Sequence, residues 1–151
     1  MILFLDTSAL VKLIIPEDRS AEAIAWFKAA DLTASSVITY AEACSALGQN
    51  DRRRHSRTSL IGRWLAGLDE HWRDVMRVPV AERAAGRLAL AHGLRGMDAL
   101  QLAAAITLRD ELQEKAAGGH VQEVVLAAFD RRLLEAAERE GFATLGGPLT
   151  S

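Results

Sequence analysis

Cysteine, excess charge and long hydrophobic runs are all scarce in this sequence. Its one cysteine, Cys44, excludes a disulfide within the chain, which suits a reducing compartment. The formal net charge of -2 gives no overall attraction to nucleic acid, so any basic surface must be local. The first apolar stretch ends at Asp6, too early for a signal peptide or a membrane span, and charges interrupt the later stretches. We therefore expect a cytoplasmic protein that does not enter a membrane.

What the sequence does contain is enough apolar material for one folded domain. Of its 151 residues, 50% are hydrophobic, which argues against disorder. A domain of this size buries roughly 70% of the surface of its unfolded chain, so the fold needs no disulfide to hold it. We find no linker, internal repeat or low-complexity segment that would divide the chain. A single domain over residues 1–151 is the prediction.

Short apolar runs alternate with helical patterns along the chain. Strands are predicted at residues 2–5, 32–35, 75–80, 124–129 and 142–145. Helices are predicted at residues 7–15, 20–30, 39–48, 53–68, 81–92, 98–117 and 130–140. Pro79 either ends the third strand or places it near a sheet edge. The alternation predicts an α/β fold in which a short, mainly parallel central sheet has helices on both faces.

Four acidic residues occupy one kind of position, at the start of a predicted helix. Asp6 directly follows the first strand, and Asp130 follows the apolar run that ends at Phe129. Glu42 and Asp98 begin two further helical patterns. In a parallel α/β sheet, the carboxyl ends of strands and the amino ends of helices share one edge, where such folds place their sites. The four carboxylates are therefore expected to converge on that edge.

Each acid also has a simpler structural explanation. Aspartate is a favoured residue at the amino end of a helix, where it contributes about 1 kcal/mol. Glu42 has the spacing of a capping box with Thr39. Taken one at a time, capping is the better explanation for each of the four. The sequence leaves convergence open, and convergence decides between the two explanations.

A cluster of four ionised carboxylates needs a compensating charge. Two carboxylates about 6 Å apart repel by roughly 3 kcal/mol at an effective dielectric constant near 20, and four of them form six such pairs. The dipole at a helix amino end stabilises each carboxylate by only about 0.3–1 kcal/mol. Protonation or a divalent cation must therefore stabilise the cluster. Oxygen ligands without a thiolate favour Mg²⁺, for which Mn²⁺ can substitute.

The four acids lie in motifs that resemble those of PIN-domain ribonucleases in their order and spacing. The motifs are Leu5-Asp6-Thr7-Ser8-Ala9-Leu10, Thr39-Tyr40-Ala41-Glu42, Met97-Asp98-Ala99-Leu100-Gln101-Leu102-Ala103 and Phe129-Asp130-Arg131-Arg132-Leu133. The resemblance is strongest to VapC-type toxins of bacterial toxin–antitoxin pairs, and it covers nearly the whole chain. One departure is Ala128, where the family often has a small hydroxyl residue.

The resemblance implies a PIN-like three-layer sandwich that acts as a Mg²⁺-dependent endoribonuclease. The four acids would be the catalytic residues and would hold one or two Mg²⁺ ions, with Glu42 and Asp130 bound directly or through water. The ions would generate hydroxide from water and neutralise charge on the attacked phosphate. Ser8 would orient Asp6 or a metal-bound water, or would equally satisfy backbone groups of the first helical turn. RNA is the implied substrate, and a small antitoxin protein and a second copy of the chain are the implied partners.

Two basic segments are candidates for contact with RNA. Arg95 lies three residues before Asp98, in the loop Gly93-Leu94-Arg95-Gly96, and is the residue that we predict to bind the substrate. The run Arg52–Arg57 either follows RNA phosphates or is a solvated helix start. The second interpretation is favoured, because arginines at a helix amino end are common on surfaces.

Two rival classes of function fit parts of the pattern. One is a non-catalytic RNA- or protein-binding module of the same fold, which the presence of all four acids disfavours. The other is a phosphotransferase of the haloacid dehalogenase kind, which also begins with a strand followed by an aspartate. That chemistry requires a second aspartate two residues later, where this chain has Ser8.

Overall fold

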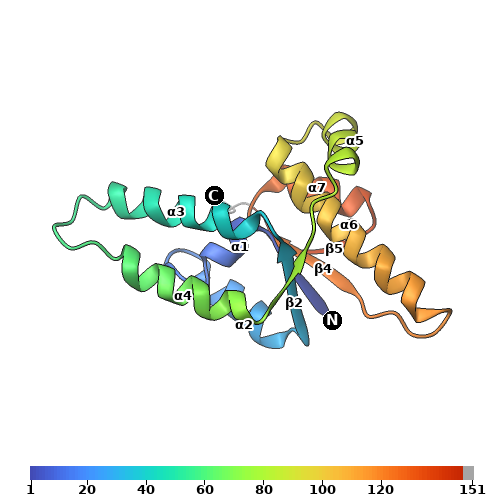
Figure 1. Ribbon diagram of the computed structural model, residues 1–151, viewed down its shortest axis with the longest axis horizontal. Coiled ribbons are helices and arrows are strands. Elements are labelled where there is room, and N and C mark those ends of the chain that lie inside the picture. Colours follow the sequence, from blue (N-terminus) through green and yellow to red (C-terminus); the bar gives the residue numbers. More distant parts are fainter. Residues whose placement is uncertain (148–151) are drawn as a thin grey trace.

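In a computed structural model that describes residues 1–147, five parallel strands lie between two layers formed by seven helices (Figure 1). The strands are β1 (Ile2–Leu5), β2 (Leu32–Ser36), β3 (Val75–Val78), β4 (Val124–Ala128) and β5 (Ala143–Gly146). The helices are α1 (Thr7–Val11), α2 (Ser20–Ala29), α3 (Thr39–Arg53), α4 (Ile61–Arg73), α5 (Glu82–His92), α6 (Gly96–Ala116) and α7 (Arg131–Arg139). None of the helices in this part of the chain is long and apolar enough to cross a membrane. Residues 148–151, the end of the predicted domain, lie outside the described part.

The strand order places the carboxyl ends of β1 and β4 side by side. Every strand pair is parallel, and the order is β3-β2-β1-β4-β5. The chain first extends from β1 to β3 and then returns through α5 and α6 to place β4 on the other side of β1. Such a reversal opens a crevice at the carboxyl ends of the two strands. Because Leu5 lies opposite Ala127, Asp6 and Asp130 leave the sheet at the same edge.

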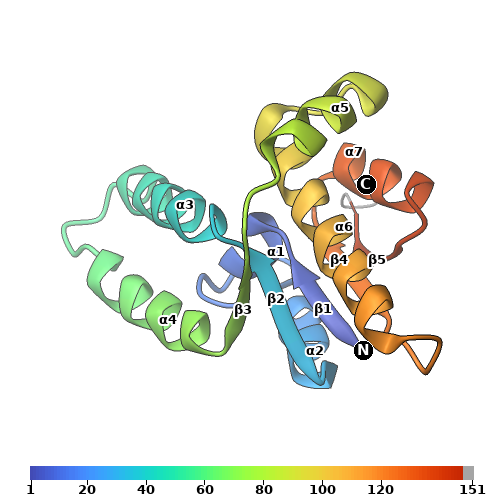
Figure 2. The ribbon, with the colours of Figure 1, turned by 45° about the vertical axis from the view of Figure 1, so that its right-hand side comes forward.

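Strand β1 contributes to two hydrophobic cores, because its side chains alternate between the faces of the sheet. Ile2 and Phe4 pack with α5, α6 and α7 on one face. Leu3 and Leu5 pack with α1, α3 and α4 on the other. All four side chains are at most 1% exposed, as expected of a parallel sheet that helices cover on both faces. Figure 2 shows these two helical layers on opposite sides of the strands.

One predicted helix is wrong. The segment predicted as a single helix over residues 53–68 is the end of α3, a turn, and the first part of α4. The Asp51 carboxylate organises this turn, since it accepts hydrogen bonds from the Ser59 hydroxyl at 2.6 Å and from the Leu60 amide at 2.7 Å. Local hydrophobic spacing does not report such a contact. The two helices form a hairpin that projects from the sheet, with this turn at its tip (Figure 1).

The ends of three further elements bear on the predictions. Helix α1 ends at Val11, earlier than predicted. Helix α6 begins at Gly96, so Asp98 lies in its first turn and not at its cap. Strand β3 ends at Val78 and forms an edge of the sheet, which confirms both readings of Pro79.

Candidate active site

The four acids line one cavity at the carboxyl edge of the sheet. Asp6 and Asp130 reach it from the ends of β1 and β4, while Glu42 and Asp98 reach it from the first turns of α3 and α6. The cavity has a volume of about 410 Å³. Its other lining residues are Thr7, Ser8, Val11, Lys12, Glu17, Ala46 and Phe129. The structure therefore brings together acids that are up to 124 residues apart in the chain, from position 6 to position 130.

The carboxylates surround the cavity and do not meet at one point. Among residues 1–147, no group of three His, Cys, Asp or Glu side chains is placed so that it could hold a metal ion by itself. They nevertheless share one cavity and, at Asp98, influence one another electrostatically. The site is thus an open acidic cavity and not a closed coordination shell.

Asp6 is buried and held by the residue two positions after it. The Ser8 amide and hydroxyl donate to Asp6 Oδ2 at 3.0 and 2.6 Å. Ser8 Oγ also accepts a hydrogen bond from the Phe129 amide at 2.9 Å, which ties the loop after β4 to α1. Burial raises the pKa of Asp6, and the hydrogen bonds from Ser8 oppose that rise. The Ser8 hydroxyl therefore contacts the Asp6 carboxylate, as one interpretation expected, and its backbone partner is Phe129 after β4 and not the first turn of α1.

Glu42 is held by two donors from other parts of the chain. The Thr7 hydroxyl and the Gln101 amide donate to Glu42 Oε2 at 2.7 and 2.9 Å. The predicted capping box with Thr39 is wrong, because Thr39 Oγ1 instead accepts a hydrogen bond from Gln101 Nε2 at 2.8 Å. Thr39 Oγ1 also lies 2.8 Å from the Ser35 hydroxyl. Capping therefore does not explain Glu42.

Asp6 and Asp130, in contrast, do cap helices. Asp130 Oδ1 accepts a hydrogen bond from the Leu133 amide at 3.0 Å at the start of α7. Asp6 caps α1 through its bond from the Ser8 amide. Both residues also line the cavity. Helix capping and convergence on the carboxyl edge are therefore both found at these two positions.

Asp98 also has a pKa raised above its ordinary value. Its partial burial, followed by the charges of Asp130 and Asp6, raises its pKa to about 6, and Arg95 opposes this rise. A carboxyl group with such a pKa is partly protonated just below neutral pH. Burial is the larger cause of this rise, and the neighbouring carboxylates of Asp130 and Asp6 add to it.

The raised pKa of Asp98 predicts how stability depends on pH. An acid whose pKa rises from 3.8 to about 6 on folding binds more protons in the folded state. Its stabilising contribution is complete below the unfolded pKa and is lost as the pH rises through the folded pKa. The protein in EDTA should therefore melt at a higher temperature near about pH 5 than near about pH 7. Asp98→Asn is the control, and an equally steep pH dependence in that variant would contradict the assignment.

The two basic segments lie in different places. Arg95 is exposed, directly precedes α6 and lies near enough to Asp98 to affect its pKa, but it does not line the cavity. The Arg52–Arg57 run is exposed at the tip of the α3–α4 hairpin, away from the carboxyl edge of the sheet (Figure 1). Within it, Arg54 lies over the Trp64 ring. Substrate binding by Arg95 stays a prediction. The exposed position of Arg52–Arg57 suits the interpretation of that segment as a solvated surface.

Several residues at the cavity or behind it were not singled out from the sequence, among them Thr7, Gln101 and Lys12. Thr7 and Gln101 hold Glu42, and Lys12 lines the cavity wall. Their spacing from residues already suspected could have pointed to two of them, because residues three or four positions apart lie on the same side of a helix. Gln101 lies three positions after Asp98 in an otherwise apolar stretch, and Lys12 lies four positions after Ser8.

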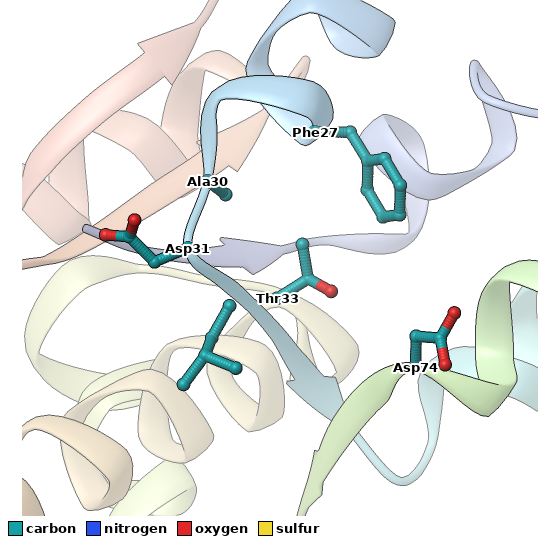
Figure 3. Close-up of a pocket in the computed structure, with 6 residues that line it drawn as sticks. Phe27, Ala30, Asp31, Thr33 and Asp74 are labelled. Carbon is teal, nitrogen blue, oxygen red and sulfur yellow. The ribbon is translucent and has the colours of Figure 1, made fainter.

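A second cavity, of about 390 Å³, lies at the opposite edge of the sheet (Figure 3). Its lining residues are Phe27, Ala30, Asp31, Leu32, Thr33 and Asp74. Asp31 is ion-paired with the amino-terminal group. The carboxyl-edge cavity is therefore the stronger candidate, because it gathers four acids from four separate elements, one of them with a strongly raised pKa.

The fold and the acidic crevice between β1 and β4 define the class of protein. The chain belongs to the PIN domain family, whose model matches residues 3–140. It is 32% identical to ribonuclease VapC45 of Mycobacterium tuberculosis (strain CDC 1551 / Oshkosh) over 143 residues, which cover 93% of this chain and 92% of that protein. This confirms the family that the motifs resembled.

Solved structures share the same fold at lower sequence identity. PAE2754 from Pyrobaculum aerophilum superposes with a TM-score of 0.62 at 21% identity, over 95% of this chain and 92% of that one. VapC20 from Mycobacterium tuberculosis, a toxin that cleaves the sarcin-ricin loop, superposes with a TM-score of 0.58 at 17% identity, over 93% and 96%. At these identities the likeness concerns the fold alone, and it confirms the predicted PIN-like α/β architecture.

Proposed function

We propose that this protein is a Mg²⁺-dependent endoribonuclease and the toxin of a toxin–antitoxin pair. The observation that carries the proposal is that four acids from four elements line one cavity at the carboxyl edge of a PIN fold. The similarity to a protein named a ribonuclease supports the RNA substrate. A toxin with the same fold supports the cellular role.

The donor set of the cavity fits a hard divalent cation. Asp6, Glu42, Asp98 and Asp130 offer only oxygen ligands, and neither Cys nor His is among the lining residues that the structure describes. Mg²⁺ and Mn²⁺ prefer such ligands and keep several water molecules. Because no three acidic side chains meet at one point, we propose direct ligation by Asp6 and Asp98, with Glu42 and Asp130 bound directly or through water. When bound, the ion would activate water as the nucleophile and neutralise charge on the attacked phosphate.

The protein's own part in this reaction is to hold the acids in fixed orientations. Ser8 holds Asp6, while Thr7 and Gln101 hold Glu42. Groups that are fixed before the substrate arrives need no reorganisation as charge develops in the transition state. We assign Ser8 this orienting role, in addition to its bond from the backbone amide after β4.

An antitoxin protein and a second copy of the chain are the partners that we propose. A nuclease that cuts the RNA of its own cell requires a neutralising protein. For self-association, α5 and α6 offer small residues along a shallow groove, among them Gly86, Ala89 and Gly96. Nearby on α5, Leu90 is 90% exposed. Sedimentation of the purified chain at several concentrations tests the homodimer.

The direct test is cleavage of RNA with and without metal. The purified protein should cleave members of a panel of single-stranded and structured RNAs in Mg²⁺, and none in EDTA. Mg²⁺ should also raise the unfolding temperature, because binding to the folded state relieves repulsion among the acids. Asp98→Asn should show a smaller Mg²⁺-dependent rise. A protein that neither cleaves RNA nor responds to Mg²⁺ would contradict the proposal.

A further inference from the structure

Lys12 is a cation built into the wall of the acidic cavity. It is the one lysine or arginine among the lining residues in the described part of the chain. Its ammonium group donates to Glu17 Oε1 at 2.9 Å and to the Asp18 carbonyl at 2.8 Å. The same group lies 4.7 Å from the centroid of the Phe129 ring. The side chain is 14% exposed, so the charge is held in one place.

Stability alone does not account for this arrangement. Glu17 is 38% exposed, and ion pairs with such an exposed partner contribute little to folding. The contact with the Phe129 ring adds a modest attraction. Against both stands the conformational entropy lost when a lysine side chain is fixed, which is of similar size. A fixed charge that stabilises the fold so little calls for another role.

We propose that Lys12 binds a backbone phosphate of the RNA strand that enters the cavity, a proposal that rests on the ribonuclease function above. The cavity wall carries one ammonium group and five carboxylates, namely Asp6, Glu17, Glu42, Asp98 and Asp130. A polyanion enters such a cavity only where cations offset its charge. Two of the three N–H groups of Lys12 are used by Glu17 and Asp18, and the third remains for a phosphate oxygen. Because the side chain is already ordered, little further entropy is lost on binding.

Glu17 is the counter-ion of Lys12 in this arrangement. Its carboxylate holds the ammonium group in the free protein and repels the incoming phosphate. Replacing Lys12 and replacing Glu17 should therefore have opposite effects on RNA binding. If the pair served only to tether the α1–α2 connection, the two replacements would have similar effects.

Arg19 supplies a matched control. Its guanidinium carbon lies 4.8 Å from the centroid of the same Phe129 ring, and its side chain forms an ion pair with Glu22. Arg19 does not line the cavity. Lys12→Met and Arg19→Met each remove one positive charge beside Phe129, and only the first removes a charge from the cavity.

The test uses a single-stranded RNA oligonucleotide that the wild-type protein cleaves in Mg²⁺, with initial rates at several KCl concentrations. Lys12→Met should raise KM about tenfold, the loss of one charge-assisted contact, and change kcat less. It should also reduce the steepness of log(kcat/KM) against log[KCl] by about 0.7, the value for one single-strand phosphate. Glu17→Gln should lower KM. Arg19→Met should leave both KM and the salt slope unchanged. Lys12→Arg keeps the positive charge and should retain most of the affinity, which separates loss of charge from any loss of stability in Lys12→Met.

Several outcomes would overturn the assignment. Equal rises in KM for Lys12→Met and Glu17→Gln would reduce the pair to a structural tether. An effect of Arg19→Met as large as that of Lys12→Met would show that general surface charge is responsible. If the wild-type protein cleaves RNA and Lys12→Met matches it in KM and salt slope, the Lys12 proposal alone fails. If the wild-type protein cleaves none of the RNAs, the ribonuclease function fails, and the Lys12 proposal with it.

Discussion

Asp6→Asn is expected to abolish RNA cleavage while leaving the metal-free protein at least as stable as the wild type. Asp6 is 7% exposed, and burial raises its pKa, so its ionised form costs free energy that a neutral amide avoids. The asparagine oxygen can still accept the hydrogen bond from the Ser8 amide and cap α1. Loss of the anionic ligand should cost more than the roughly 10–100-fold that follows when a partner of a metal ligand is removed.

Cleavage on gels and thermal unfolding in EDTA together measure this result. Asp130→Asn is the matched control, since Asp130 lines the same cavity and also caps a helix. Its catalytic loss should be the smaller of the two if it contacts the ion through water. A large fall in the unfolding temperature of Asp6→Asn with cleavage intact would instead reduce Asp6 to a helix cap.

Gln101→Met is expected to lower kcat about 10–100-fold and to leave KM nearly unchanged. Gln101 is 1% exposed, and its amide donates both to Glu42 Oε2 and to Thr39 Oγ1. Methionine fills a similar volume but donates no hydrogen bond, so Glu42 keeps only the bond from Thr7. Without its second donor the Glu42 carboxylate can rotate away from the orientation that the reaction needs. RNA binding does not depend on that orientation, so the loss falls on kcat.

Stability must be separated from positioning in this variant. Every buried side-chain nitrogen or oxygen in residues 1–147 has a hydrogen-bond partner, so the substitution leaves groups unmatched at a cost of about 1–3 kcal/mol each. Leu108→Ala supplies the control, because Leu108 is buried in the same helix and its truncation destabilises by about 2–5 kcal/mol. That variant should keep a normal kcat below its unfolding temperature. A similar fall in kcat for both would assign the effect to general destabilisation.

The sequence by itself determined where most elements lie and which acids stand at their ends. The unbroken apolar run from Ile2 to Leu5 predicted a short strand, and the strand is found with those bounds. Pro79 marked the end of β3 because proline lacks the N–H that a strand partner requires. These features are local, since they depend on neighbouring residues and on the period of the side chains. The same holds for the family motifs, each of which occupies a short segment.

Only the tertiary structure decided which of these local features meet. Asp6 and Asp130 face one cavity because β1 pairs with β4 in parallel, and no local pattern specifies that strand order. The bond from Gln101 to Glu42 joins residues 59 positions apart, and it turned an expected capping box into a pair of hydrogen bonds at the site. Likewise Asp51 ended a helix that hydrophobic spacing had extended. In each case the deciding interaction is a hydrogen bond outside the local hydrophobic pattern, and in the first two it joins distant segments whose contact depends on packing and register.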